Sequence, residues 1–326
     1  MKAGAVSLAI VSLLACFSNV GAQTFPPAPK KQVDIGAREA PLTDAERVDL
    51  DKAVTKHDYA AEKAVMDRAL TEHPASFELL VMKGRLAYLE RQAPDAADAL
   101  ERADKIKPLT EQDRLTLALA YQFSRKTKEA RNELQKLTGS APNNAEYVYL
   151  LGRLDAQNQQ PEAAEKDFAK AIKLNPKLVR AYEELGEVQE QLGRAEDARK
   201  TYEAGAAANR KLAAPWEWSP LDLGVAMLKT NEYDASEKLI REALRYNPRF
   251  AWGHYYLAQI QQKRGRNTDA VTEYKEAVVD DPRLRQAWLA LGREFARQGD
   301  KVESDKCIAI FKKLEEQQNA LKGRKN

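Results

Sequence analysis

One spacing recurs along most of this 326-residue chain and limits its fold more than any other feature. Small residues stand 34 positions apart, except for one interval of 38 between Gly186 and Gly224. The series is Gly84, Ala118, Gly152, Gly186, Gly224, Ala258 and Gly292. Prolines keep the same period and the same four-residue slip, at Pro74, Pro108, Pro142, Pro176, Pro248 and Pro282. Such a period indicates stacked copies of a small unit that cannot bury its apolar face alone.

Each unit reads as two amphipathic helices separated by a turn, as in residues 145–178. Two helices approach closely only where a small side chain lies at their crossing, which explains the Gly/Ala series of the first helix. The second helix has its own small residues at Ala96, Ala130, Ala164, Ala198 and Ala270. Large residues are expected to fill the space beside them, at Leu100, Leu134, Phe168, Tyr202, Ile240 and Tyr274. The prolines end the second helices, because proline lacks an N–H and clashes with the preceding turn.

The order of these residues resembles the tetratricopeptide repeat (TPR) pattern W-x2-L-G-x2-Y, A-x3-F and P. One unit carries Trp288, Leu291, Gly292 and Phe295, and another carries Leu151, Gly152, Ala164, Phe168, Ala171 and Pro176. The resemblance covers roughly residues 43–318 and implies an all-α fold, a right-handed superhelical solenoid of helix-turn-helix units. In TPR proteins the first helix of each unit lines a concave groove, so the resemblance also implies where a partner would bind.

Residues 1–22 have the composition of a signal peptide, with Lys2 before an apolar run and small residues at Val20-Gly21-Ala22. An alternative is open, because Leu13-Leu14-Ala15-Cys16 resembles a lipobox in which Cys16 would be lipidated. Either alternative takes the protein across a membrane. We therefore expect an exported bacterial protein, periplasmic or secreted, or else a lipoprotein whose membrane contact is made only through Cys16.

Residues 23–42 contain clustered prolines and no periodic apolar face, which predicts a disordered tether. TPR units 1–5 are expected over 43–212, beginning with Thr43 as a helix cap and Glu46 completing a capping box. Thr110 and Asp113 repeat this pattern at the third unit.

The four-residue slip falls within 210–219, RKLAAPWEWS. We expect an inter-repeat loop or hinge at 213–219, then Ser219 as a cap, Pro220 as the first helical residue and a short helix over about 220–229. Units 6–8 follow over 217–318, and 319–326 form a basic C-terminal tail.

The chain offers no catalytic motif. It has no glycine-rich phosphate loop, no G-x-S-x-G and no H-E-x-x-H, and His57, His73 and His254 have no metal-ligand spacing. We therefore expect no enzyme activity, no cofactor and no metal. The near balance of charge, with a net charge of +3, argues against a nucleic-acid partner. Cys307 is expected to be a small buried residue of the last hairpin.

The remaining class of function is recognition of a partner at the protein surface. We expect the partner to bind at the groove positions of the first helices. The candidate partner-binding residues are Tyr149, Arg153, Glu183, Glu187, Trp218, Trp252, Tyr255, Gln259 and Arg293. The predicted groove is acidic at its centre and aromatic after the slip. The Lys/Asn clamp with which some TPR grooves hold a C-terminal carboxylate is absent, because its positions carry Val81, Thr116, Tyr149, Leu150 and Glu184.

The aromatic residues have two interpretations. Trp216, Trp218 and Trp252 could fill the space opened by the slip, since aromatic residues at helical spacing usually belong to a core. Alternatively, Trp218, Trp252 and Tyr255 form a pocket for an apolar anchor of a partner peptide. The leading hypothesis is a non-catalytic protein–protein interaction scaffold of the bacterial cell envelope that binds a partner peptide or segment. The alternative is a protein that binds a glycan or small ligand through the aromatic wall.

Overall fold

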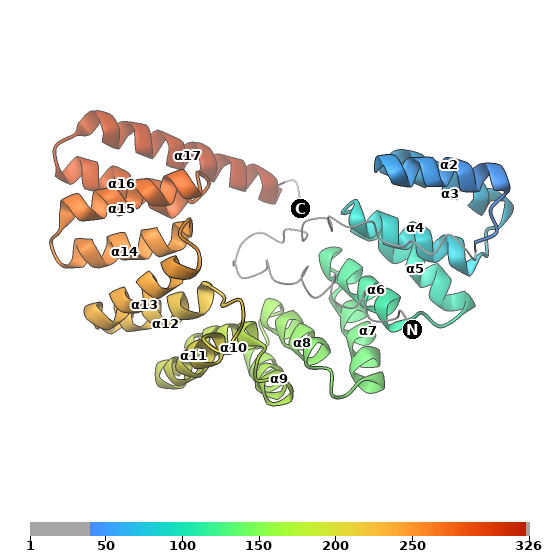
Figure 1. The fold of residues 1–326 in the computed structure, drawn as a ribbon, viewed down its shortest axis with the longest axis horizontal. Helices are drawn as coiled ribbons and strands as arrows, with labels where there is room; N and C mark the ends of the chain where they lie inside the picture. Colours follow the sequence, from blue (N-terminus) through green and yellow to red (C-terminus); the bar gives the residue numbers. More distant parts are fainter. Residues whose placement is uncertain (1–39, 324–326) are drawn as a thin grey trace. The chain divides into compact units, whose positions relative to one another are not determined.

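The computed structural model describes residues 40–323, and every regular element in that range is an α-helix (Figure 1). The first seven helices are α2 (Asp44–Lys56), α3 (Tyr59–Glu72), α4 (Phe77–Leu89), α5 (Ala93–Ile106), α6 (Glu111–Phe123), α7 (Thr127–Ser140) and α8 (Ala145–Gln157). The next are α9 (Pro161–Leu174), α10 (Val179–Gln191), α11 (Ala195–Asn209), α12 (Trp218–Lys229) and α13 (Tyr233–Tyr246). The last are α14 (Ala251–Lys263), α15 (Asn267–Asp280), α16 (Arg285–Arg297) and α17 (Lys301–Gly323). The all-α prediction is confirmed for this part of the chain.

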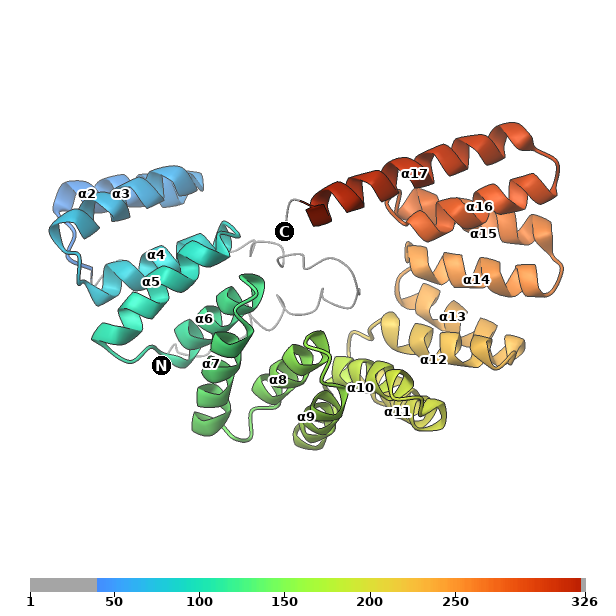
Figure 2. The same cartoon turned by 180° about the vertical axis from the view of Figure 1, so that it is seen from behind.

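The chain divides into two compact units, each of several repeats, whose described parts are residues 40–158 (unit 1) and 159–323 (unit 2). Within them the helices pair as antiparallel hairpins that stack in chain order, α2–α3, α4–α5 and α6–α7 in unit 1 and α10–α11, α12–α13, α14–α15 and α16–α17 in unit 2 (Figures 1 and 2). In both units the second helix of a hairpin packs against the first helix of the next, as α5 packs on α6 and α13 on α14. First helices of successive hairpins also contact one another directly, α4 with α6 and α10 with α12. Each unit is therefore a helical solenoid with one layer of first helices and one of second helices.

The predicted crossing residues lie where the two helices of a hairpin meet. A β-carbon added to Gly84 would stand 2.5 Å from Leu100 Cγ, and one added to Gly224 would stand 3.0 Å from Ile240 Cγ1. The large second-helix residues are all buried, with Phe168 at 0% and Tyr274 at 1% exposure. The alanine series is buried too, which confirms that these positions form the core between the helices.

The turn after each described first helix contains one residue in the left-handed αL region, at the same place in the repeat. These residues are His57, Arg91, Arg125, Gln159, Gly193, Asn231, Gly265 and Gly299. The turn requires this conformation because the backbone must reverse direction within a few residues. Glycine adopts it without steric penalty, whereas other residues do so at some cost.

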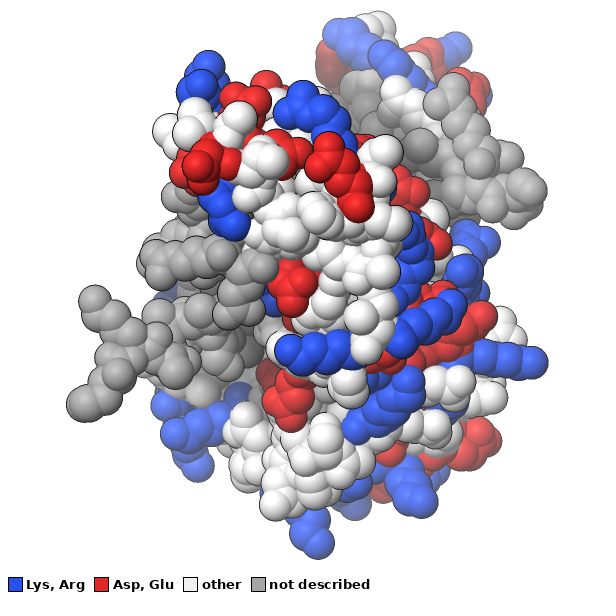
Figure 3. Space-filling view, turned by 90° about the vertical axis from the view of Figure 1, so that its right-hand side faces the viewer, with Lys and Arg blue, Asp and Glu red and all other residues white. Residues whose placement is uncertain are grey.

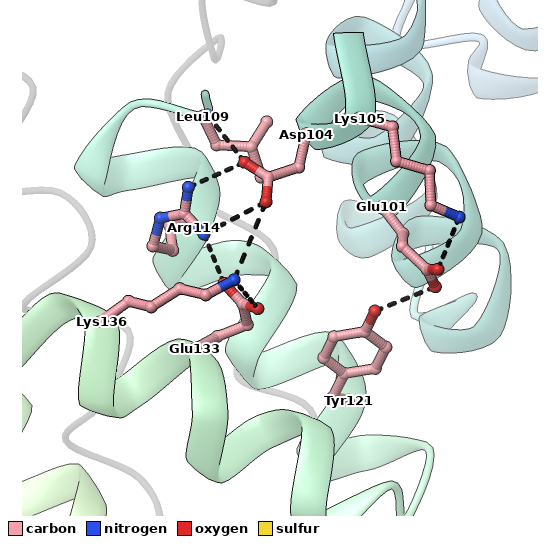
Figure 4. A network of polar contacts seen from close by, with 8 residues as sticks. All are labelled: Glu101, Asp104, Lys105, Leu109, Arg114, Tyr121, Glu133 and Lys136. Carbon is pink, nitrogen blue, oxygen red and sulfur yellow. Dashed lines mark hydrogen bonds and ion pairs between the residues drawn. The ribbon is translucent and has the colours of Figure 1, made fainter. Parts of the chain in front are cut away.

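Ion pairs join neighbouring hairpins at partly buried positions. In unit 1 the guanidinium of Arg114 donates to Asp104 on α5 at 2.7 Å and to Glu133 on α7 at 2.5 Å (Figure 4). Lys136 adds a 2.7 Å bond to Glu133. Burial by itself would raise the pKa of Asp104, but the Leu109 amide and Arg114 together hold it below its usual range. The network ties three helices of unit 1 together.

The helix caps partly match the sequence predictions. Thr43 and Glu46 form the predicted capping box, and the Thr110 hydroxyl accepts from the Asp113 amide at 3.2 Å. The predicted cap at Ser219 is wrong, because α12 begins at Trp218 and Ser219 lies inside its first turn, where it is buried. Pro220 is consequently the third helical residue. Proline is tolerated there because amides of the first turn have no partner within the helix.

The slip is taken up mainly by the loop between α11 and α12. The other hairpins are joined by four residues, as from Leu174 to Val179, whereas eight residues, 210–217, join α11 to α12. The side chain of Asn209, 1% exposed, holds this loop by accepting from the Trp216 amide and donating to the Trp216 carbonyl, both at 2.7 Å. A longer loop is present as predicted, and it is fastened to the helix before it.

Both ends of the described range depart from the prediction. Ala40 and Leu42, assigned to the tether, are buried, and the Arg47 guanidinium donates to the Ala40 carbonyl at 2.7 Å. At the other end α17 continues to Gly323, so residues 319–323 of the predicted tail are helical. Cys307 is buried in the last hairpin, as predicted. The predicted signal peptide, Cys16 and most of the tether lie outside the described residues.

Candidate functional site

The first helices of unit 2 carry a continuous group of aromatic side chains, which we call the aromatic cluster: Trp218, Phe250, Trp252, Tyr255 and Tyr256. Trp218 meets Phe250 edge to face, with 4.9 Å between the ring centroids. Its ring is tilted against that of Trp252, with 6.4 Å between the centroids. Trp252 stacks on Tyr256 at 5.9 Å and meets Tyr255 edge to face at 5.6 Å. The structure therefore brings together the three aromatic residues that the sequence singled out, and adds two more.

Four members of the aromatic cluster remain partly exposed, unlike the core aromatic residues Phe168, Tyr202 and Tyr274 of the second helices. Trp218, Trp252, Tyr255 and Tyr256 are of intermediate exposure, whereas Phe168, Tyr202 and Tyr274 are at most 4% exposed. Trp252 also packs against the buried cores of two neighbouring hairpins. The cluster thus belongs to the packing of unit 2 and still presents aromatic surface on the first-helix layer.

Two polar candidates border the aromatic cluster. Burial raises the pKa of Tyr255, while a hydrogen bond from Gln259 and the nearby charge of Arg293 act in the opposite direction. Gln259 and Arg293 therefore both act on the Tyr255 hydroxyl. The Arg293 side chain is exposed. These residues place a hydrogen-bonding group and a positive charge beside the aromatic rings.

Carboxylates gather on α10 and α12, and we call Glu183, Glu187, Glu190 and Asp222 the carboxylate cluster. Glu183 is 4% exposed, and its Oε2 accepts from the Trp216 indole N–H at 3.2 Å. Burial, followed by the charges of Glu184 and Glu187, raises the Glu183 pKa to about 8. With no cation bound beside it, this environment disfavours the ionised form of Glu183.

Asp222 shares this environment from the neighbouring helix. Burial raises its pKa well above the usual range, and Glu183, Glu187 and Glu190 raise it further. The opposing charge comes from Lys229, which is itself bonded to both Glu190 oxygens at 2.7 and 2.8 Å. Among the described residues, the only cation that acts on Asp222 in this way is therefore already engaged by Glu190.

The two clusters adjoin at Tyr256. Burial raises the pKa of this phenol to about 12, and Tyr255, Asp222 and Glu190 contribute in that order. The helix that carries Asp222, α12, contacts both α10, which carries Glu190, and α14, which carries Tyr256. The acidic and aromatic parts of the predicted site therefore lie next to each other on the first-helix layer of unit 2.

The remaining two candidates, Tyr149 and Arg153, lie on α8 in unit 1. Both are buried, at 2% and 8% exposure, and the Arg153 guanidinium lies over the Tyr149 ring, 5.9 Å from its centroid. A buried ring offers little surface to a partner. The pair contributes to packing in unit 1 and is distinct from the exposed candidates.

Other kinds of site were sought in the described residues. No three His, Cys, Asp or Glu side chains in residues 40–320 are grouped as a metal site would require. The ring nitrogens of His254 face two acceptor oxygens, Nδ1 that of Glu273 at 2.7 Å and Nε2 the Pro248 carbonyl at 3.2 Å, and donate to them in a structural role. No helix among those described has the length and apolar character of a membrane span. On the face shown in Figure 3, basic and acidic side chains are interspersed among uncharged ones.

The family model described as "Tetratricopeptide repeat" matches residues 149–213, 221–282 and 257–304. These segments contain the hairpins α10–α11 and α14–α15 and, from Leu221 on, the hairpin α12–α13, and they include every residue of the two clusters except Trp218. Over these residues the chain is built of tetratricopeptide repeats. Its two clusters therefore lie on TPR first helices.

Solved structures of TPR type share this fold. A tetratricopeptide repeat protein from Parabacteroides merdae aligns with 78% of this chain and all of its own, at 17% identity and a TM-score of 0.58. Yeast Tom70 aligns with 84% of the chain and 61% of its own length, at 18% identity and a TM-score of 0.55. PilW, a type IV pilus biogenesis factor, aligns with 61% of the chain and 90% of its own, at 16% identity and a TM-score of 0.53.

A curated relative is the cellulose synthase 1 operon protein C of Komagataeibacter xylinus. It is 21% identical over an aligned length of 179 positions, and the alignment covers 52% of this chain. The match spans only 14% of the relative's own length. The similarity is therefore that of a repeat segment within a much longer protein.

Sequence reasoning did not assign Phe250, Tyr256, Glu190, Asp222 or the indole of Trp216 to the site. Tyr256 directly follows the predicted groove residue Tyr255 and so was not expected to face the same surface. Trp216 lies in the slip loop, and its bond to Glu183 joins residues 33 positions apart. The acidic character of α10 was visible in the sequence, but the position of this indole was not.

Proposed function

We propose that this TPR protein is a non-catalytic scaffold that binds a segment of a partner protein on the first-helix layer of unit 2. TPR proteins are typically protein–protein interaction scaffolds, and the chain shares their fold. The observation that carries the proposal is the aromatic cluster, whose Trp and Tyr rings are in mutual contact yet remain partly exposed.

The chemistry of the cluster suits a protein partner. Tryptophan, tyrosine and arginine contribute most to binding energy when they lie at the centre of an interface. Trp218, Trp252 and Tyr255 supply apolar contact area, and Gln259 and Arg293 supply polar contacts at its border. The rings are already held by one another, so little conformational entropy is lost when a partner binds.

The glycan alternative has less support. A sugar stacks on a broadly exposed flat ring face, whereas Trp252 stacks on Tyr256 with an interplanar angle of 27° and both rings are partly buried. The adjacent carboxylates suit a charged peptide better than a neutral sugar.

We place the scaffold in the bacterial cell envelope, as a periplasmic or secreted protein or as a lipoprotein anchored at Cys16. This part of the proposal depends on the composition of residues 1–22. Fractionation of cells that express the full chain tests it: recovery of the whole uncleaved chain in the cytosol would contradict it.

Site-specific photo-crosslinking in the cell of origin tests the binding surface. A benzoylphenylalanine is placed at Gln259 or Arg293 on the first-helix layer, and at Glu276, which is exposed on the second helix α15, as the matched control. We expect the same protein adduct from Gln259 and Arg293 and none from Glu276. An equal yield from Glu276, or no adduct at either first-helix position, would contradict the proposal.

A further inference from the structure

The carboxylate cluster has an unmet requirement for a positive charge. Glu183 is almost completely buried, and its Oε1 has no hydrogen-bond partner among the described residues. Its other oxygen is bonded only to the neutral Trp216 indole. A buried carboxylate oxygen without a partner is costly, and such atoms are rare in folded proteins.

The neighbouring groups do not meet this requirement. Lys229 is bonded to both oxygens of Glu190. Arg180 attracts Glu183 weakly, as the last of the influences on that carboxyl, after the repulsion from Glu184 and Glu187. No hydrogen bond or ion pair to Asp222 is present within the described part of the chain. Two carboxyl groups on adjacent helices are thus held close together with their charges poorly compensated.

The position of this cluster indicates what would compensate it. Asp222 and Glu190 act on Tyr256, which stacks on Trp252 at 5.9 Å, so the carboxylates border the aromatic cluster. A guanidinium or ammonium group on a flexible stem can pack its methylenes against the rings and its charge against the carboxylates. No three of these acids are placed to hold a metal ion.

We propose that the carboxylate cluster receives an arginine or lysine side chain of the partner segment whose apolar anchor contacts the aromatic cluster. The inference deepens the proposed function and rests on it, and it gives the partner a defined chemistry: a cationic residue close in sequence to an apolar one. Charge complementarity between Asp222, Glu183 and the incoming cation provides the selectivity.

The four tryptophans of the chain provide a direct measurement. Each gives one indole N–H signal in a ¹⁵N NMR spectrum, assigned with single Trp→Phe variants. The Trp216 indole donates to Glu183, whereas the Trp288 indole donates to the Pro282 carbonyl at 2.9 Å and serves as an internal control. The probe is N-acetyl-arginine amide, compared with its neutral isostere N-acetyl-citrulline amide at constant ionic strength.

We expect a saturable shift of the Trp216 signal with the arginine probe, about tenfold weaker with the citrulline probe, and no shift of Trp288. Asp222→Asn should reduce the response to the arginine probe about tenfold, and Glu196→Gln, an exposed change on α11, should leave it unchanged. Equal responses to the two probes, or an unaltered response in Asp222→Asn, would overturn the inference.

The outcomes separate this inference from the proposed function. Crosslinks at Gln259 and Arg293 together with equal responses to arginine and citrulline would leave a partner-binding surface without a cation site. A Trp216 shift that depends on protein concentration without any probe would assign the cluster to a second copy of the chain and would also overturn the inference.

Discussion

A β-carbon on Gly186 would stand 2.5 Å from the Cζ atom of Tyr202, so the tyrosine ring occupies the space that any larger residue would need. The ring is 4% exposed and is held between the helices of the hairpin. We predict that Gly186→Ala destabilises the protein by about 1–3 kcal/mol, the usual effect of overpacking a rigid core.

Gly139 is the matched control for this substitution. It lies in α7, also within a helix, and nothing stands within 4 Å of the added β-carbon. Gly139→Ala should stabilise the protein by roughly 0.4–1 kcal/mol, because alanine loses less backbone entropy on folding. Urea unfolding of both variants measures the difference, and changes of the same sign in both would contradict this account of the crossing.

The crossing residues were predictable from the sequence because their requirement repeats. Gly186 contacts Tyr202 as Gly84 contacts Leu100, so the repeat period identifies the contact between the two helices in each case. Where the residue type changed, the sequence pattern had a gap: the slot of the alanine series in α13 holds Ser236, which is fully buried. Its hydroxyl donates to the Gly224 carbonyl at 2.6 Å. A polar residue fits there because its partner lies on the facing helix.

Gly265 tests the turn conformation separately from packing. Its φ is +73°, and nothing lies within 4 Å of an added β-carbon, so only the backbone opposes a substitution. Gly265→Ala should destabilise the protein by about 1 kcal/mol, and Gly265→Asn by less, since asparagine tolerates αL better. Thermal unfolding of the two variants gives the comparison. If alanine were as stable as glycine, the αL requirement inferred for this turn would be incorrect.

The αL residues of the turns could not all be predicted from the sequence. The αL position recurs in the turn after every described first helix, but it holds glycine in only three of these eight turns, at Gly193, Gly265 and Gly299. Arg91, Arg125 and Gln159 occupy it elsewhere, and none of these residue types signals a turn. The hairpin imposes the conformation because the packing of its two helices compensates the cost at a single residue.

The loop at the slip is expected to be rigid, in contrast to the hinge predicted from its sequence. Asn209→Ala removes both bonds to Trp216 and leaves that residue's amide and carbonyl without their partners, which should cost about 2 kcal/mol. Hydrogen exchange of the Trp216 amide should become more than about tenfold faster. An exchange rate and melting temperature equal to those of the unaltered protein would indicate that the loop is held by other contacts or moves freely.

The candidate site was predictable in outline and not in detail. The acidic residues of α10 and the tryptophans after the slip are visible in the sequence because first-helix positions repeat every 34 residues. The burial of Glu183 was not, because it depends on Trp216, which reaches it from a loop that breaks the repeat. After this loop α12 begins at Trp218, one residue before the predicted cap at Ser219.

The raised pKa of Glu183 predicts how stability depends on pH. Because burial and the neighbouring carboxylates raise the pKa from 4.5 to about 8, the folded protein binds more protons than the unfolded chain between these values. Glu183 therefore opposes stability as the pH rises: its contribution is most favourable below about 4.5 and is lost progressively up to about 8. The charged groups that set this pKa are Glu184, Glu187 and Arg180.

Glu183→Gln removes the ionisation and keeps an oxygen that can accept from the Trp216 indole. Urea unfolding between pH 5 and pH 9 should show that the variant gains stability relative to the unaltered protein as the pH rises, with the difference levelling off above about pH 8. Glu196→Gln, on the exposed face of α11, should show no such trend. A constant difference between Glu183→Gln and the unaltered protein over this range would mean that Glu183 is already ionised at pH 5, and that the carboxylate cluster is better compensated than its geometry indicates.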